Sequence, residues 1–209
     1  MSQCLFGFSV RYFPLTASVA YALTAGFASP ALAFTAVEQV KTYAIVGQSG
    51  PELYASIGAR GPVISDGRRT VAHTTFKLTW QRDYRPQGDG SCVLTRAKPK
   101  LIITYTLPKP QGSMPADVAS NWKRFADGLA AHEKIHGEQI IAMVEKIEAF
   151  STGLRAEADP DCQKVRAALQ AQLKIISDER VSLSRNFDRK EMGAGGNIQK
   201  LVFKLVKGP

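Results

Sequence analysis

The sequence predicts an α+β fold in which a small antiparallel sheet carries two long antiparallel helices on one face. Residues 74–80 and 101–107 alternate polar and apolar side chains, as strands with one wet face and one core face do. Further along the chain, apolar residues recur every three or four positions over residues 115–150 and again over residues 162–187. Strands that precede a pair of long helices favour the α+β class.

Turn-forming residues separate the expected strands. We expect strands at residues 36–47, 70–84 and 92–107, and a last edge strand at residues 201–206. A cluster of turn residues at 47–51 ends the first strand, and Pro51 opens a short helix. A hairpin-like loop at 85–91, which contains two glycines, joins the second strand to the third.

Start and stop signals bound the two long helices. The first begins near Pro115 and is expected at residues 115–150, because a Ser-Thr-Gly stretch at 151–153 ends it. The second begins after Asp159, which is followed by a proline. A connection of about ten residues joins the helices, so they should lie antiparallel and side by side.

The first long helix contains the motif H-E-x-x-H, formed by His132, Glu133 and His136. Residues i and i+4 lie one above the other on a helix, so both imidazoles can reach one metal ion. Glu133 lies about 100° around the helix axis, where its carboxylate can take a proton from a water activated by the metal. The motif therefore predicts two zinc ligands and a general base of a metalloprotease. An ordinary pair of part-buried histidines is the alternative.

A catalytic zinc site usually has three protein ligands and a water, so the motif needs one more ligand. Position 142, where one class of these enzymes carries a further histidine, is Ala142. If the long helices pair antiparallel around the loop between them, the two histidines face residues 176–180. Glu179 lies in that zone and is our best candidate, ahead of Asp188 and His73.

Residues 1–33 differ from the rest of the chain, and Arg11 is their only charged side chain. An apolar, Ala-rich run followed by Ala-Leu-Ala at 31–33 fits a signal peptide that is cleaved before Phe34. We therefore expect a single domain at 34–209, exported to the periplasm or outside the cell. A retained membrane anchor is the alternative. No later apolar run is long enough to span a bilayer.

Removal of that segment takes away Cys4 and leaves Cys92 and Cys162. An even number of cysteines in an exported chain predicts a disulfide between them, with two separate buried thiols as the alternative. The formal net charge of the whole chain is +9. This charge suits a solvated basic surface or contact with anionic polymers of the cell envelope. No basic run interleaved with aromatic residues indicates nucleic-acid binding.

With these parts in place, the chain resembles DUF922, a family of bacterial secreted proteins described as zinc-dependent proteases. Besides the H-E-x-x-H motif, the resemblance is carried by Tyr43, Gly47, Gly61, Pro62, Trp80, Tyr84, Cys92, Leu107, Pro108, Trp122, Cys162, Phe187 and Asp188. It covers most of the chain after residue 33 and implies zinc and peptide-bond hydrolysis. The family tends to carry another histidine shortly after the pair at 187–188, whereas no histidine follows His136 here.

The expected function is that of an exported zinc-dependent metallopeptidase. Its substrate would be a peptide or a cell-envelope component, and a peptide or amide bond would be hydrolysed by water. The alternative is a degenerate relative, a non-catalytic binding or structural protein of the envelope with an incomplete metal site. Two properties would separate these functions: whether the protein retains zinc, and whether hydrolysis requires Glu133.

Overall fold

The computed structural model describes residues 34–64 and 67–208. The expected signal peptide at residues 1–33 lies outside the described residues, so its cleavage stays a prediction. In chain order the described elements are β1 (Val37–Ile45), α1 (Gly50–Arg60), β2 (His73–Pro86), β3 (Cys92–Pro110), α2 (Ala116–Ser151), β4 (Arg155–Ala156), α3 (Gln163–Met192) and α4 (Asn197–Lys207). A small sheet with helices packed against it confirms the α+β class.

The sheet has β3 at its centre, with β1 on one side and β2 on the other. β2 runs antiparallel to β3, as expected for two strands joined by a short loop. β1 runs parallel to β3, so the sheet is mixed rather than purely antiparallel. Alternation of polar and apolar residues shows which face a strand buries, but it does not show in which direction the neighbouring strand runs. Because α1 and a loop separate β1 from β2, β1 is free to pair with β3.

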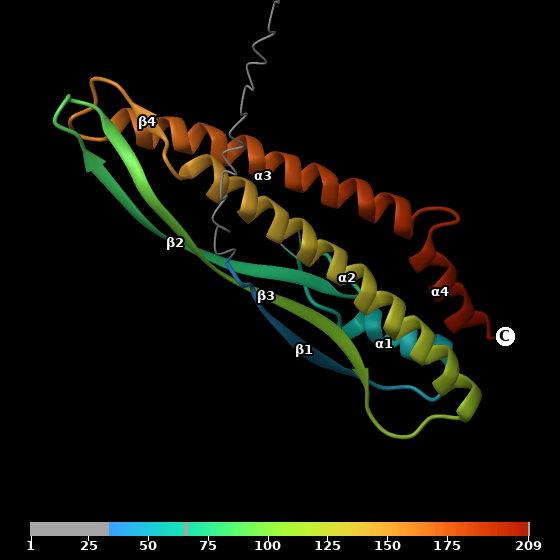
Figure 1. Ribbon diagram of the computed structural model, residues 1–209. Helices are drawn as coiled ribbons and strands as arrows, with labels where there is room; N and C mark the ends of the chain where they lie inside the picture. Colours follow the sequence, from blue (N-terminus) through green and yellow to red (C-terminus); the bar gives the residue numbers. More distant parts are fainter. Residues whose placement is uncertain (1–33, 65–66, 209) are drawn as a thin grey trace, which may run out of the picture. The chain divides into compact units, whose positions relative to one another are not determined.

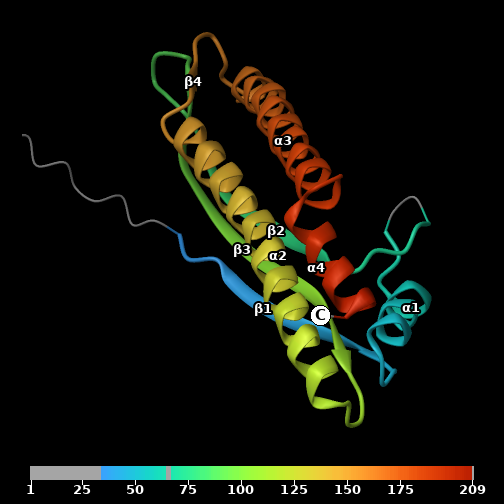
Figure 2. The ribbon, with the colours of Figure 1, turned by 90° about the vertical axis from the view of Figure 1, so that its right-hand side faces the viewer.

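The helices lie on one side of the sheet (Figures 1 and 2). α2 packs along the central strand β3. α3 lies beside α2 and farther from β3. α1 and α4 contact each other near the start of α2. α1 begins as expected, with a capping box between Ser49 and Glu52 and a proline in its first turn. The two long helices predicted from the apolar stripes are α2 and α3, and they run antiparallel to each other as expected.

The C-terminal element is a helix, so the expectation of an edge strand at residues 201–206 was wrong. The buried and part-buried residues of α4 are Ile198, Leu201, Val202 and Leu205, which recur at helical spacing. A six-residue window is too short to separate this period from that of a strand. α4 packs closely on α1, because a Cβ at Gly50 would lie 1.7 Å from the carbonyl oxygen of Leu205.

Three clusters of buried side chains hold the domain together. One lies around Phe125, where α1 and α4 meet the first half of α2. The second joins β3 to the second half of α2 and includes Ile103 and Val144. The third surrounds the disulfide and packs Leu94 of β3 against Val165 of α3. The long helix α2 thus buries its stripe against different partners along its length.

The connection between α2 and α3 sets how these helices face each other. After α2 ends at Ser151, the chain continues as β4, which pairs with the start of β3 before α3 begins. α3 therefore extends past the end of α2, and its first turns pack on the hairpin end of the sheet. As a result, His136 faces Ser184 and Asp188 instead of the residues 176–180 that a simple hairpin of helices would place there.

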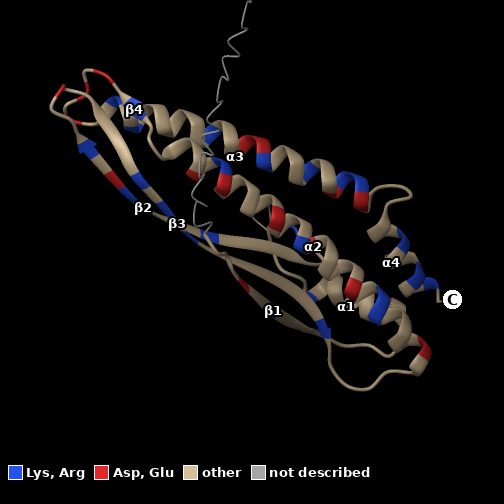
Figure 3. Ribbon diagram, viewed as in Figure 1, with Lys and Arg blue, Asp and Glu red and all other residues tan. Residues whose placement is uncertain are grey.

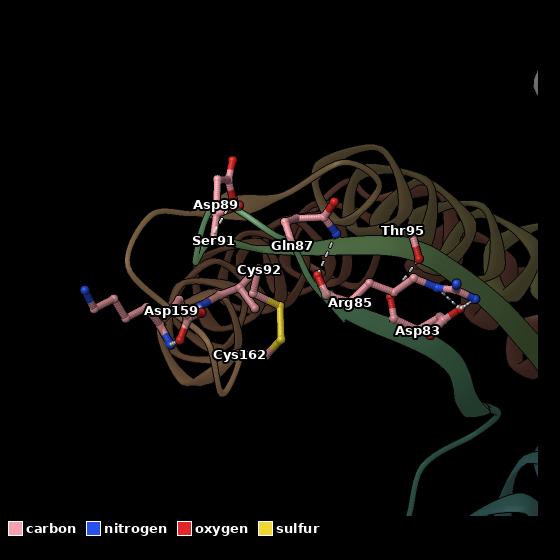
Figure 4. The surroundings of a disulfide bond; sticks show 11 residues. Asp83, Arg85, Gln87, Asp89, Ser91, Cys92, Thr95, Asp159 and Cys162 are labelled. Atoms are coloured by element: carbon pink, nitrogen blue, oxygen red, sulfur yellow. Dashed lines mark hydrogen bonds and ion pairs between the residues drawn. A yellow bond between two sulfur atoms is a disulfide. The ribbon is translucent and has the colours of Figure 1, made fainter.

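A disulfide joins Cys92 to Cys162, as predicted, and ties the start of β3 to the residue before α3 (Figure 4). The Asp159 carboxylate accepts hydrogen bonds from the backbone N–H groups of Lys164 and Val165, at 3.0 and 2.9 Å. Although burial opposes it, these backbone donors lower the pKa of Asp159. The carboxylate thereby caps the first turn of α3 beside the disulfide.

Basic side chains are distributed over the described surface. Lys and Arg occur on all four described helices and on strands β2 and β3, with acidic residues among them (Figure 3). Within the part of the chain that the structure describes, no helix combines the length and the apolar character needed to cross a membrane.

Candidate metal centre

The two histidines of the motif point to the same place from successive turns of α2. His132 and His136 lie in the apolar stripe, between Leu129 and Ile140. The Nε2 atoms of the two imidazoles are 3.2 Å apart. His132 is 3% exposed, and the His136 side chain is 12% exposed. Two buried ring nitrogens therefore converge on one point at the helix surface.

A carboxylate from α3 completes this convergence. Oδ1 of Asp188 lies 3.2 Å from Nε2 of His132 and 2.8 Å from Nε2 of His136. Three nitrogen and oxygen donors of His132, His136 and Asp188 thus lie within 4.8 Å of one another. Asp188 is partly open to solvent, with its side chain 42% exposed. The donors are buried on the helix side and accessible from the outside.

The distances among the three donors suit one metal ion. Ligands that lie about 2.0–2.1 Å from a tetrahedral zinc are about 3.4 Å from one another. The separations here are 2.8 to 3.2 Å, so a small outward movement of the donors accommodates an ion. Two imidazole nitrogens and a carboxylate oxygen this close would repel one another through their lone pairs unless a proton or a cation lay among them. The residues present therefore fit a divalent metal.

Neighbouring side chains orient the two imidazoles. The hydroxyl of Ser184, one turn before Asp188 on α3, lies 2.8 Å from Nδ1 of His136. If Nδ1 carries the proton and donates it to Ser184, the lone pair of Nε2 faces the other donors, as ligation requires. The ring of Phe187 stacks on His132, with centroids 4.6 Å apart and an interplanar angle of 19°. α3 thus supplies a candidate ligand, a hydrogen-bond partner and a packing surface.

Glu133 is held by the neighbouring strand β2. It is 3% exposed, and its Oε2 accepts a hydrogen bond of 2.5 Å from Oγ1 of Thr74. The same hydroxyl lies 3.2 Å from the backbone carbonyl of Glu133. Thr74 therefore fixes both the carboxylate and the turn of α2 that bears it. Both residues line the same pocket as the histidines.

Asp188 and the histidines shift one another's pKa values. Burial opposes the charged form of Asp188, but hydrogen bonds from His132 and His136 outweigh it and hold the pKa of Asp188 well below its usual range. Burial likewise opposes protonation of His136, yet the hydrogen bond and negative charge of Asp188 raise the pKa of His136 above its usual value. Without a metal, Asp188 and His136 therefore each keep their charged form more readily than the same groups do in water.

The donors open into a pocket of about 520 Å³. β2 contributes His73 and Thr74, and the preceding loop contributes Arg68 and Arg69. α3 contributes Arg180 from its second half and Met192, its last residue. The pocket is large enough for a group of several atoms. It connects the three donors with solvent.

The structure brings most of the predicted site residues together, but it places Glu179 elsewhere. It brings His132, His136 and Glu133 together at this pocket, and it places Asp188 beside the two imidazoles. Glu179, our first choice for the third ligand, instead pairs with Lys146 at 2.6 Å on the exposed side of the helix pair.

Two contributors were not foreseen from the sequence. Thr74 belongs to an alternating strand, and Ser184 lies on the second long helix with no motif around it. Neither carries a local signal, because each acts only through a contact made across the fold. His73, a weaker candidate for the third ligand, lines the pocket but is not part of the three-donor group.

Fold and site together define an α+β domain with a candidate metal centre of two histidines and one aspartate. The chain matches, over residues 40–196, the model of a family described as bacterial protein of unknown function (DUF922). The match covers well over half of the chain, so the protein belongs to the DUF922 family. No curated protein and no solved structure matches the chain.

Proposed function

We propose that this protein is an exported zinc-dependent metallopeptidase that hydrolyses peptide or amide bonds. The observation that carries the proposal is the convergence of His132, His136 and Asp188 in an open pocket that also contains Glu133. Two imidazoles and one carboxylate form a ligand set typical of catalytic zinc sites, which keep a further position for water or substrate. Because the Asp188 side chain is partly exposed to solvent, the three donors suit an open catalytic site better than a closed structural site.

Zinc in this site would supply Lewis acidity and bring the pKa of a water toward about 7. Glu133 is the candidate general base, because its carboxylate is buried beside the two imidazoles in the same pocket. Thr74 holds one carboxylate oxygen of Glu133, which leaves the other oxygen to receive a proton and pass it to a leaving amine. Thr74 is therefore a positioning residue in this scheme.

The pocket also offers positive charge for a substrate. Arg180 lines it from α3, and burial lowers the pKa of its guanidinium, since a charged group is disfavoured away from water. A cation at this place can stabilise negative charge that develops on a carbonyl oxygen during hydrolysis. Export is supported by the Cys92–Cys162 disulfide, because such crosslinks persist in oxidising compartments outside the cytosol.

The test combines metal analysis with a single substitution. The protein purified without chelator should hold one zinc, and Glu133→Gln should retain it while hydrolysis of labelled casein or a cell-wall peptide falls by about a hundredfold or more. Glu145→Gln removes an exposed carboxylate from the same helix and should change neither property.

Two other outcomes would count against catalysis. Purified protein that remains metal-free at stoichiometric zinc would favour the degenerate binding or structural protein. Firm zinc binding with no hydrolysis of either probe, or equal hydrolysis by Glu133→Gln, would assign the site a non-catalytic role.

A further inference from the structure

A second pocket, of about 410 Å³, lies between β2 and α3 toward the disulfide end of the domain. Its lining residues are Trp80, Arg82, Tyr84, Arg166 and Gln170. The first three alternate along β2, so they share the face of the strand that looks toward the helices. The last two lie one turn apart on α3. Strand and helix thus present two guanidinium groups to one cavity.

Both arginines stack on aromatic rings, and neither forms an ion pair with a carboxylate of the described residues. The guanidinium carbon of Arg82 lies 5.0 Å from the centroid of the Trp80 ring, and that of Arg166 lies 3.8 Å from the centroid of the Tyr84 ring. Stacking of this kind fixes the plane of a guanidinium but leaves its N–H donors unused. No acidic residue is among the five that line the pocket.

Arg82 carries the clearest sign of a missing partner. Its Nε and Nη2 atoms are shielded from solvent and have no hydrogen-bond partner among the described residues. These two nitrogens form one edge of the guanidinium, and that edge pairs with two oxygens of a carboxylate or phosphate. Buried charged donors without an acceptor are rare in folded proteins and call for an explanation. In the present rotamer both atoms are closed to solvent, so an oxyanion in the pocket becomes their acceptor once the Arg82 side chain turns this edge toward it.

We propose that the pocket formed by Arg82, Arg166 and Gln170 binds an oxyanion, the carboxylate or phosphate group of a ligand. Arg82 and Arg166 provide the charge, the Gln170 amide provides a further donor, and Trp80 and Tyr84 form apolar walls for the rest of the ligand. The site uses other residues of β2 and α3 than the metal centre does, so it does not depend on the proposed hydrolysis.

Trp80 makes binding measurable. The chain has two tryptophans, and the other, Trp122, is buried in the core. In a Trp122→Phe background treated with EDTA, the fluorescence of Trp80 is titrated with inorganic phosphate and, separately, with a blocked di-glutamate peptide. The proposal expects a saturable change with at least one probe. The stronger of the two responses distinguishes a phosphate site from a carboxylate site.

Matched variants locate the site. Arg82→Gln and Arg166→Gln should each weaken binding by about tenfold or more, since a hydrogen bond to a charged group is lost. Arg96→Gln removes the same charge from an exposed position on β3 and should leave the affinity unchanged. Arg82→Lys keeps the positive charge but lacks the paired Nε and Nη2 donors, so it should bind the anion more weakly than wild type. The same variant replaces Arg82→Gln in this test if Arg82→Gln does not fold.

Two results would overturn the proposal. One is the absence of a saturable response to both probes in the folded Trp122→Phe protein. The other is an equal loss of affinity in Arg96→Gln and Arg82→Gln, because it would mean that net positive charge, and not this pocket, attracts the anion.

Discussion

Asp188 is the third donor of the candidate metal centre. It contacts both imidazoles through one carboxylate oxygen, and it comes from a different helix than they do. Its neighbour Phe187 stacks on His132, so the pair at 187–188 forms one wall of the site. The third donor is thus an aspartate of α3, at a position where the resemblance to DUF922 already showed a match.

Asp188→Asn should weaken zinc binding by about a hundredfold or more, because even the loss of an outer partner of a ligand typically costs 10 to 100-fold. Competition with a fluorescent zinc chelator measures the affinity. Glu179→Gln is the matched control, since Glu179 pairs with Lys146 at the surface, and it should bind zinc as wild type does. If the Glu179 variant bound zinc more weakly and the Asp188 variant bound it normally, the third ligand would be Glu179. The helices would then pair as the sequence predicted.

The pH dependence of stability should reverse when metal is added. In the metal-free protein, the raised pKa of His136 contributes stability that is complete below pH 6.5 and is lost as the pH rises through the raised value. The lowered pKa of Asp188 contributes stability that is present above pH 3.8 and is lost as the pH falls through the lowered value. The stabilisation by this pair is therefore largest between these two limits.

Thermal unfolding of wild type and Asp188→Asn in EDTA should consequently differ most near about pH 5 and less at about pH 8. Added zinc should stabilise the wild type more at pH 8 than at pH 5, because protons compete with the metal for the imidazoles. A zinc effect that grows as the pH falls would mean that the metal is not bound by His132 and His136.

At the level of elements, the approach of α2 to the sheet is set by Gly137, the residue after His136. A Cβ at this position would lie 2.0 Å from the hydroxyl oxygen of Tyr105 on β3. A glycine therefore lets the turn that carries His136 lie directly against the sheet. A larger residue must displace either the Tyr105 side chain or α2, and a displaced α2 moves the imidazole with it.

Gly137→Ala should lower the free energy of unfolding by about 1–3 kcal/mol, the usual cost of overpacking a core, and should weaken zinc binding. Urea denaturation and zinc competition measure the two effects. Gly58→Ala is the control, because a Cβ there meets nothing within 4 Å and the residue lies within α1. It should stabilise slightly, since alanine favours a helix over glycine. Equal behaviour of the two variants would mean that Tyr105 yields easily.

On the scale of the whole molecule, the disulfide and the contacts of Asp188 with the two histidines hold opposite ends of α3. Cys162 precedes the first turn of the helix and is bonded to the start of β3, whereas Asp188 lies in its last turns. Between them, few side chains of α3 are fully buried, namely Val165, Leu169 and Ile176. A long helix with so narrow a buried stripe relies on its two ends for its position.

Replacement of Cys92 and Cys162 by serine should therefore destabilise the domain by about 2–5 kcal/mol, because the crosslink closes a sequence separation of 70 residues. Thermal unfolding with and without reductant measures the effect. Thiol counting in denaturant without reductant should find neither cysteine reactive. Reductant that leaves the unfolding temperature of the wild type unchanged would show that packing alone holds this end of α3.

The sequence by itself determined what depends on local spacing. Apolar residues at helical intervals located α2 and α3, alternation located β2 and β3, and the pair of cysteines left after the N-terminal segment predicted the crosslink. The motif placed His132, Glu133 and His136 on one helix. Each of these features is decided within a few turns or a single strand, so periodicity is enough to recognise it.

Only the tertiary structure decided what these parts meet. β4 extends the connection before α3 starts, and this shift brings Asp188 to the histidines and sends Glu179 to Lys146. The same holds for Thr74 on Glu133, the parallel pairing of β1 and the packing of α4 on α1. The physical reason is that contacts between distant segments depend on how the connecting chain runs and on how closely backbones approach, and neither quantity is written in a local pattern.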